Sequence, residues 1–193
     1  MSEETDKKIK KQGLIKGVFL GLVISAISII YFYFMVEVAK SALAISLGSM
    51  VFSYLLPLGV AVLFSLNLRA KIGGIWTMRQ AATGIFIMFF ISYLMAFIIK
   101  DQVFAKVIEP NMVQKTETAM VNALNKLKDE TTKPEEKKEA DAKILEMKKA
   151  INAERSVTIG QQIQSFGISI ILLFVLSIIF ASFFKREPAG VVS

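Results

Sequence analysis

Four stretches of the chain extend for the width of a membrane without a single Asp, Glu, Lys or Arg: residues 17–36, 41–67, 80–99 and 156–184. A helix needs about 20 apolar residues to cross a hydrocarbon core about 30 Å thick, so each stretch is long enough. Lipid offers no water to the backbone, and a helix satisfies its own N–H and C=O groups. The sequence therefore predicts an all-α membrane protein with four transmembrane helices.

Charged residues divide the chain into five segments. These are a basic N-terminus (1–16), transmembrane helices one to three (17–99), a polar insertion (100–155), transmembrane helix four (156–184) and a C-terminal tail (185–193). With 54% hydrophobic residues and a mean hydropathy of +0.55, the chain is too apolar for a soluble domain of this size. We therefore expect one membrane domain, whose immediate partner is the lipid bilayer.

Basic residues gather in three segments that flank these stretches, and their placement predicts the orientation. They are Lys7, Lys8, Lys10, Lys11 and Lys16 before the first stretch, Arg69, Lys71 and Arg79 between the second and third, and Lys185 and Arg186 after the fourth. Short basic segments stay in the cytoplasm, so both termini are predicted to be cytoplasmic and residues 100–155 to lie outside. The net charge of +7 then faces anionic lipid headgroups rather than nucleic acid.

The chain has neither cysteine nor histidine. It therefore lacks thiolate nucleophiles, the commonest general base and the commonest transition-metal ligand. The acidic pairs Glu135 with Glu136 and Asp101 with Glu109 lie among lysines, which favours solvated charge over an acid–base site. The sequence thus assigns no catalytic residue, no metal ligand and no cofactor, and we predict that the protein is not an enzyme.

Pro57 lies inside the second uncharged stretch. Proline lacks an N–H group and clashes with the carbonyl one turn earlier, so a kink is predicted at residues 53–57. An alternative is that the span covers only residues 50–66 and that Gly48 belongs to a short loop before it.

Small residues at four-residue spacing are candidates for close helix packing. One series is Gly17, Gly21 and Ser25 in the first stretch, and another is Ser165 and Ser169 in the fourth. Small side chains let helix backbones approach closely in lipid. We expect these residues to join helices of the same chain, with association of two copies as the alternative.

The connection between the second and third stretches contains Gly73, Gly74 and the only tryptophan, Trp76. Two glycines permit a sharp reversal with positive φ. Tryptophan and basic residues are enriched where a membrane meets water, so Trp76 is predicted to be an interface anchor at the level of the headgroups.

Several residues near this connection resemble a known family. They are Gly73 and Gly74, then Thr77, Gln80, Ala81 and Gly84 at the start of the third stretch. Together with the four spans and the polar insertion before the last of them, they are similar to the bacterial domain-of-unknown-function family numbered 4199, found mostly in the Bacteroidota. The resemblance implies a multi-pass protein of the bacterial cytoplasmic (inner) membrane. It transfers no catalytic residue, because the family has no established activity.

The polar insertion shows helical periodicity in two arms. Apolar residues recur near every third or fourth position in residues 112–130 and again in residues 135–155. Pro110 precedes the first arm and Pro134 suits the first position of the second. This pattern predicts an antiparallel helical hairpin that could stand out from the membrane as a stalk, with a charge-rich tip that could fray in the absence of a partner.

Three classes of function remain, of which an enzyme is the least supported because no nucleophile–base pair can be assembled. The leading hypothesis is a non-enzymatic scaffold or interaction subunit of the bacterial envelope, which binds a protein partner through the segment from Met112 to Arg155. The alternative is a small transporter or channel subunit that acts as a homo-oligomer. Ionisable residues within spans usually mark transport paths, and the absence of any here favours the scaffold.

Overall fold

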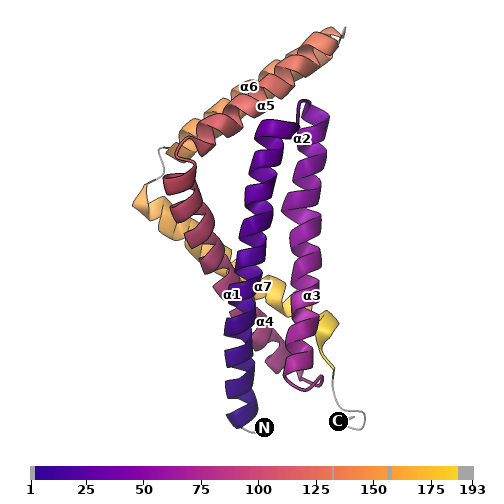
Figure 1. Ribbon diagram of the computed structural model, residues 1–193, viewed down its shortest axis with the longest axis vertical. Helices are drawn as coiled ribbons and strands as arrows, with labels where there is room; N and C mark the ends of the chain where they lie inside the picture. The colour runs from indigo at the N-terminus through magenta and orange to yellow at the C-terminus, as the bar shows by residue number, and fades with distance from the viewer. Residues whose placement is uncertain (1–2, 132, 156–157, 187–193) are drawn as a thin grey trace. The chain divides into compact units, whose positions relative to one another are not determined.

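A computed structural model describes residues 3–131, 133–155 and 158–186, without the side chains of residues 152, 154, 155 and 159 (Figure 1). Every regular element in these ranges is a helix. The elements are α1 (Glu3–Tyr33), η1 (Phe34–Val38), α2 (Ala42–Ser49), η2 (Met50–Leu55), α3 (Leu56–Lys71), α4 (Met78–Ala96), η3 (Phe97–Ile108), α5 (Met112–Glu130), α6 (Pro134–Arg155) and α7 (Ile159–Phe184), where η denotes a π-helix.

Four segments of the described chain are long and apolar enough to cross a membrane. They are Glu3–Val38, Ala42–Lys71, Met78–Ile108 and Gly160–Phe184. The predicted all-α membrane fold is confirmed. The chain forms two compact units: unit 1 comprises the described residues of Met1–Ser25, Pro57–Ile99 and Ile163–Ser193, and unit 2 comprises those of Ala26–Leu56 and Lys100–Gln162.

The core of unit 1 combines side chains from α1, α3, α4 and α7. Leu20 of α1, Leu68 of α3, and Ile85 and Met88 of α4 are almost fully buried in it. Phe180 of α7 contributes to the same cluster. Side chains from segments far apart in the sequence thus hold these four helices together.

Glycines of α1 lie directly against α4. A Cβ atom built on Gly17 would lie 2.7 Å from the Met88 carbonyl oxygen, and one built on Gly21 would lie 2.5 Å from the Met95 Cβ. Gly13, one step earlier at the same spacing, meets the Gly84 carbonyl oxygen in the same way at 3.0 Å. Ser25 is buried and donates to the carbonyl oxygen of Gly21 at 2.7 Å. The two helix backbones therefore approach too closely for larger side chains.

The α3–α4 connection holds the end of α7. Gly73 and Gly74 have φ angles of 113° and 81°, which permit the predicted reversal. Trp76 pairs with Arg186 through both backbone groups, at 3.0 and 3.2 Å. The Trp76 indole also donates to the Phe184 carbonyl oxygen at 2.8 Å. This carbonyl is one of those that a helix end leaves without an intrahelical partner.

The position of Trp76 differs from the headgroup anchor predicted from the sequence. Its side chain is only 1% exposed, because it packs within the core of unit 1. The prediction rested on the general enrichment of tryptophan at membrane interfaces. Here the ring fills space beside Gly84, where an added Cβ would lie 3.3 Å from the Trp76 Cζ3 atom.

The start of α4 is fixed by a capping box. The Thr77 hydroxyl accepts from the Gln80 backbone N–H, and the Gln80 side-chain oxygen accepts from the Thr77 N–H at 3.0 Å. The two side chains satisfy backbone donors that the first turn of a helix leaves unpaired. Ala81 is fully buried next to them.

The residues before Pro57 form a π-helix rather than a continuous α-helix. The segment η2 ends at Leu55, and the Leu56 N–H donates to the Val51 carbonyl oxygen, five residues earlier. An altered backbone is expected here because proline removes a donor and crowds the preceding turn. The alternative span of residues 50–66 is wrong, because Gly48 lies within α2 and the helix continues from Ala42 to Lys71.

Within unit 2, α5 and α6 lie side by side over the predicted ranges (Figure 1). Lys128 of α5 contacts Asp141 of α6 at 2.6 Å. Ala123 of α5 is buried in a cluster with Met35 and Ile45 from the first two spans, so this part of α5 packs on the rest of unit 2. The small side chain of alanine allows this close approach.

We expect Gly21→Ala to destabilise the protein, by about 1–3 kcal/mol, because overpacking at a tight contact forces the backbones apart. Gly167→Ala is the matched control, because a Cβ there meets nothing within 4 Å and alanine is the better helix former. Thermal unfolding in a mild detergent measures the difference. Equal melting temperatures for the two variants would contradict the close α1–α4 contact.

Candidate functional site

A cavity of about 570 Å³ opens in unit 2 where α2 and η2 meet α5 and α6. Tyr31 and Ile45 form one wall. Met120 and Leu124 of α5 and Met147 of α6 form the other. We call this cavity the unit 2 groove. Its size lies in the range of about 300–1,000 Å³ that is typical of small-molecule sites.

Packing near the middle of α5 creates the groove. Ala119, Met120 and Ala123 face the connection between the first two spans, where Met35 and Ile45 are buried. On α2, the N-terminal turn is held by the Ser41 hydroxyl, which accepts from the Ala44 N–H at 3.2 Å. These contacts position α5 against α2, and α6 then supplies the remaining wall.

Polar groups stand at the rim of the groove. The Lys143 ammonium contacts Glu139 of the same helix at 2.7 Å, so the pair carries no net charge. The Tyr31 hydroxyl donates to the Ile45 carbonyl oxygen at 3.4 Å. Tyr54 also lines the groove and is 69% exposed. An apolar ligand therefore fits this lining better than an ion does.

A second polar cluster connects α1 to the start of α5. The Tyr33 hydroxyl donates to Glu109 Oε1 at 3.2 Å, and Lys115 contacts Glu109 Oε2 at 2.7 Å. The Glu109 side chain is only 15% exposed, which differs from the solvated carboxylate predicted from the sequence. Phe32 and Phe104 pack edge to face with each other and with Tyr33, beside this cluster.

The electrostatics of this cluster favour a structural role. The hydrogen bond from Lys115 lowers the pKa of the Glu109 carboxyl, and the same bond raises the pKa of Lys115. Both groups are therefore held in their charged forms. Glu109 also directly precedes Pro110, where η3 has ended and α5 is about to begin, so the cluster fixes the direction in which α5 starts.

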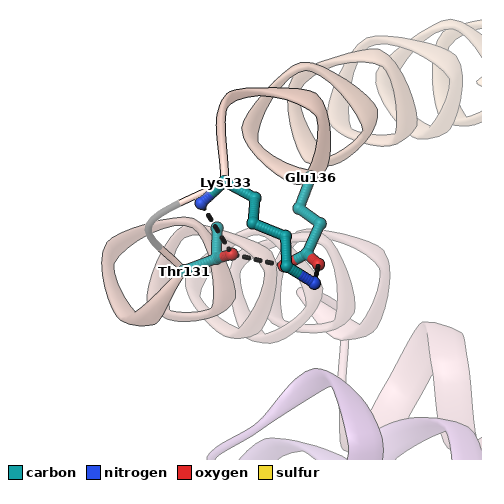
Figure 2. Close-up of polar contacts among 3 residues, drawn as sticks. All are labelled: Thr131, Lys133 and Glu136. Carbon is teal, nitrogen blue, oxygen red and sulfur yellow. Dashed lines mark hydrogen bonds and ion pairs between the residues drawn. The ribbon is translucent and has the colours of Figure 1, made fainter.

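Figure 2 shows a third group of polar side chains, at the turn between α5 and α6. Thr131 donates to Glu136, and the Lys133 ammonium contacts the same carboxylate at 2.8 Å. The bond from Lys133, followed by the bond from Thr131, lowers the pKa of Glu136, whereas the contact with Glu136 raises that of Lys133. All three are near the surface, and the contacts brace the first turn of α6.

The structure separates the two predicted series of small residues. Gly17 and Gly21 face α4, and Ser25 is buried and donates to the Gly21 carbonyl oxygen of its own helix. Ser165 is exposed, and the Ser169 hydroxyl donates to the Ser165 carbonyl oxygen within α7 at 2.9 Å. Neither series contributes to the unit 2 groove.

Sequence reasoning missed the groove and two of the local motifs. Met120, Leu124 and Met147 fit the helical periodicity of residues 112–130 and 135–155, but no local signal in the sequence shows that they line a groove with residues of the first two spans. The capping box was detectable, because Thr77 and Gln80 have the spacing of that motif. Gly13 also extends the glycine series by one four-residue step.

No group of three or more acidic side chains in the described ranges is placed to hold a metal ion. A family model described as "Protein of unknown function (DUF4199)" matches residues 15–186, which is most of the chain. No curated protein matches the sequence, and no solved structure matches it.

The Glu109–Lys115 pair is expected to make stability depend on pH. Because the folded state lowers the pKa of Glu109, its contribution is present above the unfolded pKa of the carboxyl and is lost as the pH falls through the folded pKa. Lys115→Met should therefore lower the melting temperature at neutral pH, and the difference from wild type should shrink on acidification. Lys148→Met, on the exposed surface of α6, is the control. A difference that does not change with pH would contradict the pairing.

Proposed function

The chain belongs to the DUF4199 family of proteins of unknown function, and we propose that it is a non-enzymatic scaffold or interaction subunit of the bacterial cytoplasmic (inner) membrane. In this proposal both termini are cytoplasmic, and α5 and α6 lie on the outer side. The distribution of basic residues supports this orientation. A protein partner of the envelope would bind to α5 and α6.

The observation that carries this proposal is the unequal contact along α5. Near its middle, Ala119 and Ala123 pack on the first two spans. Towards its end, Lys126 contacts Glu130 and Lys128 contacts Asp141, with side chains that remain substantially exposed. The middle of α5 thus packs on the rest of unit 2, while its end presents charges of both signs. This arrangement suits α5 to docking another protein.

The exposed ion pairs at the tip of α5 and α6 would contribute more to the specificity of partner binding than to its affinity. Exposed ion pairs contribute only about 0–1 kcal/mol each, so the tip can exchange its own pairs for pairs with a partner at little cost. Lys143 with Glu139 and Lys133 with Glu136 add two further pairs of this kind. We infer that the partner presents a surface of mixed charge. A homo-oligomer is a second way of using the same surface.

The proposal is tested by purification from native membranes in mild detergent. In the tip variant, a short Gly–Ser linker replaces residues 126–143, so that the contacts of Ala119 and Ala123 with the first two spans are retained. We expect a stoichiometric partner protein to copurify with the wild-type chain and with Gly167→Ala, and to be lost from the tip variant.

Two results would contradict the scaffold. One is a partner that copurifies equally with the tip variant. The other is solute flux through liposomes that contain the purified chain alone, which would favour a transporter or channel subunit.

A further inference from the structure

We propose that the unit 2 groove binds the acyl chain of a membrane phospholipid. The groove lies in the same unit as the charged tip of α5 and α6 (residues 126–143) and shares Lys143 with it, but the apolar lining of the groove lies outside the tip. The inference is therefore independent of the protein partner proposed above. It assigns a ligand to the region where α5 is fastened to α2.

The lining of the groove suits a flexible hydrocarbon. Three methionines contribute to it, Met50, Met120 and Met147, together with Ile45 and Leu124. Methionine side chains are unbranched and polarisable, so they adapt to ligands of variable shape. A methylene chain that moves among such side chains gains contact without needing a fixed pattern of hydrogen bonds.

One wall of the groove belongs to a membrane span. Ser46, Ser49, Met50 and Tyr54 all line the groove, and all lie within the span Ala42–Lys71. Met50 is 55% exposed and Tyr54 is 69% exposed, so this wall is open at its edge. Side chains of a span face lipid wherever protein does not cover them. An acyl chain can thus enter from the bilayer without crossing water.

The size of the groove also favours an acyl chain over a helix as the occupant. An α-helix with its side chains is about 10–12 Å across, so a volume of 570 Å³ would hold only about one helical turn. A linear chain of methylene groups can occupy the same volume along its length. An acyl chain can therefore fill the groove more completely than a whole helix can.

The rim places few demands on the lipid headgroup. Among the described residues, Lys143 is the only charged one that lines the groove, and Glu139 already contacts its ammonium at 2.7 Å. The hydroxyls of Ser46, Ser49 and Tyr54 can contact ester or phosphate oxygens of any phospholipid. Phosphatidylethanolamine and phosphatidylglycerol should consequently bind to a similar extent.

Photolabelling of the full-length chain tests this assignment. The purified protein is reconstituted in vesicles of phosphatidylethanolamine and phosphatidylglycerol that contain a trace of phospholipid with a diazirine in its acyl chain. After irradiation, mass spectrometry of peptides measures the label on α5 and α6. We expect label on Met120, Leu124 or Met147, with either headgroup on the diazirine lipid.

Filling the groove separates a bound lipid from chance contact with the membrane. Met147→Trp from α6 and Leu124→Trp from α5 should each lower the labelling of α5 and α6 several-fold, while the spans remain labelled. Leu145→Trp is the matched control, because Leu145 is 54% exposed and does not line the groove. It should leave the labelling unchanged.

The proposal is overturned if α5 and α6 of the wild-type chain carry no label. This is the result expected if another copy of the protein filled the groove and excluded the lipid. It is also overturned if the filling variants are labelled like wild type or if Leu145→Trp lowers the labelling equally. The vesicles contain no partner protein, so these outcomes do not depend on the scaffold proposal.

Discussion

The fold depends on lipid as the solvent for its helices. In the most apolar window of each candidate span, only 28%, 6%, 28% and 17% of the residues, in chain order, are buried inside the structure. Large apolar side chains such as Leu63 and Phe183 are mostly exposed. In water, exposing such side chains would cost a free energy of about 25 cal/mol per Å² of apolar surface. A bilayer removes that cost, so the helices need not bury these side chains against one another.

Because lipid tails are as apolar as leucine, the helices are joined by close packing and polar contacts instead. In unit 1, glycines such as Gly17 and Gly21 bring α1 against α4, and the Trp76 indole bonds to the last turn of α7. In unit 2, Ala123 has the role that glycine has in unit 1, and Glu109 with Lys115 sets the start of α5. Short side chains thus decide where the backbones meet.

The sequence was sufficient for every feature that follows from local periodicity or from the cost of exposing the backbone to lipid. These features include the four spans, the break at Pro110 and the bounds of α5. It was insufficient where contacts join distant segments. From the sequence, Trp76 was predicted to lie at the membrane interface and Glu109 to lie in solvent. Neither burial could be predicted, because residues that pack against these side chains lie far away in the chain. The groove was missed for the same reason, since α2 and α5 are separated by more than one span.

The central claim is that these apolar helices cross the bilayer, and the absence of cysteine allows a direct measurement. Lys133→Cys and Lys8→Cys place single thiols on opposite sides of three proposed crossings. In cells whose inner membrane is intact and can be reached by the reagent, a membrane-impermeant maleimide should label Lys133→Cys at once. It should label Lys8→Cys only after the inner membrane is permeabilised. Labelling of both from outside, or of neither before permeabilisation, would contradict the account.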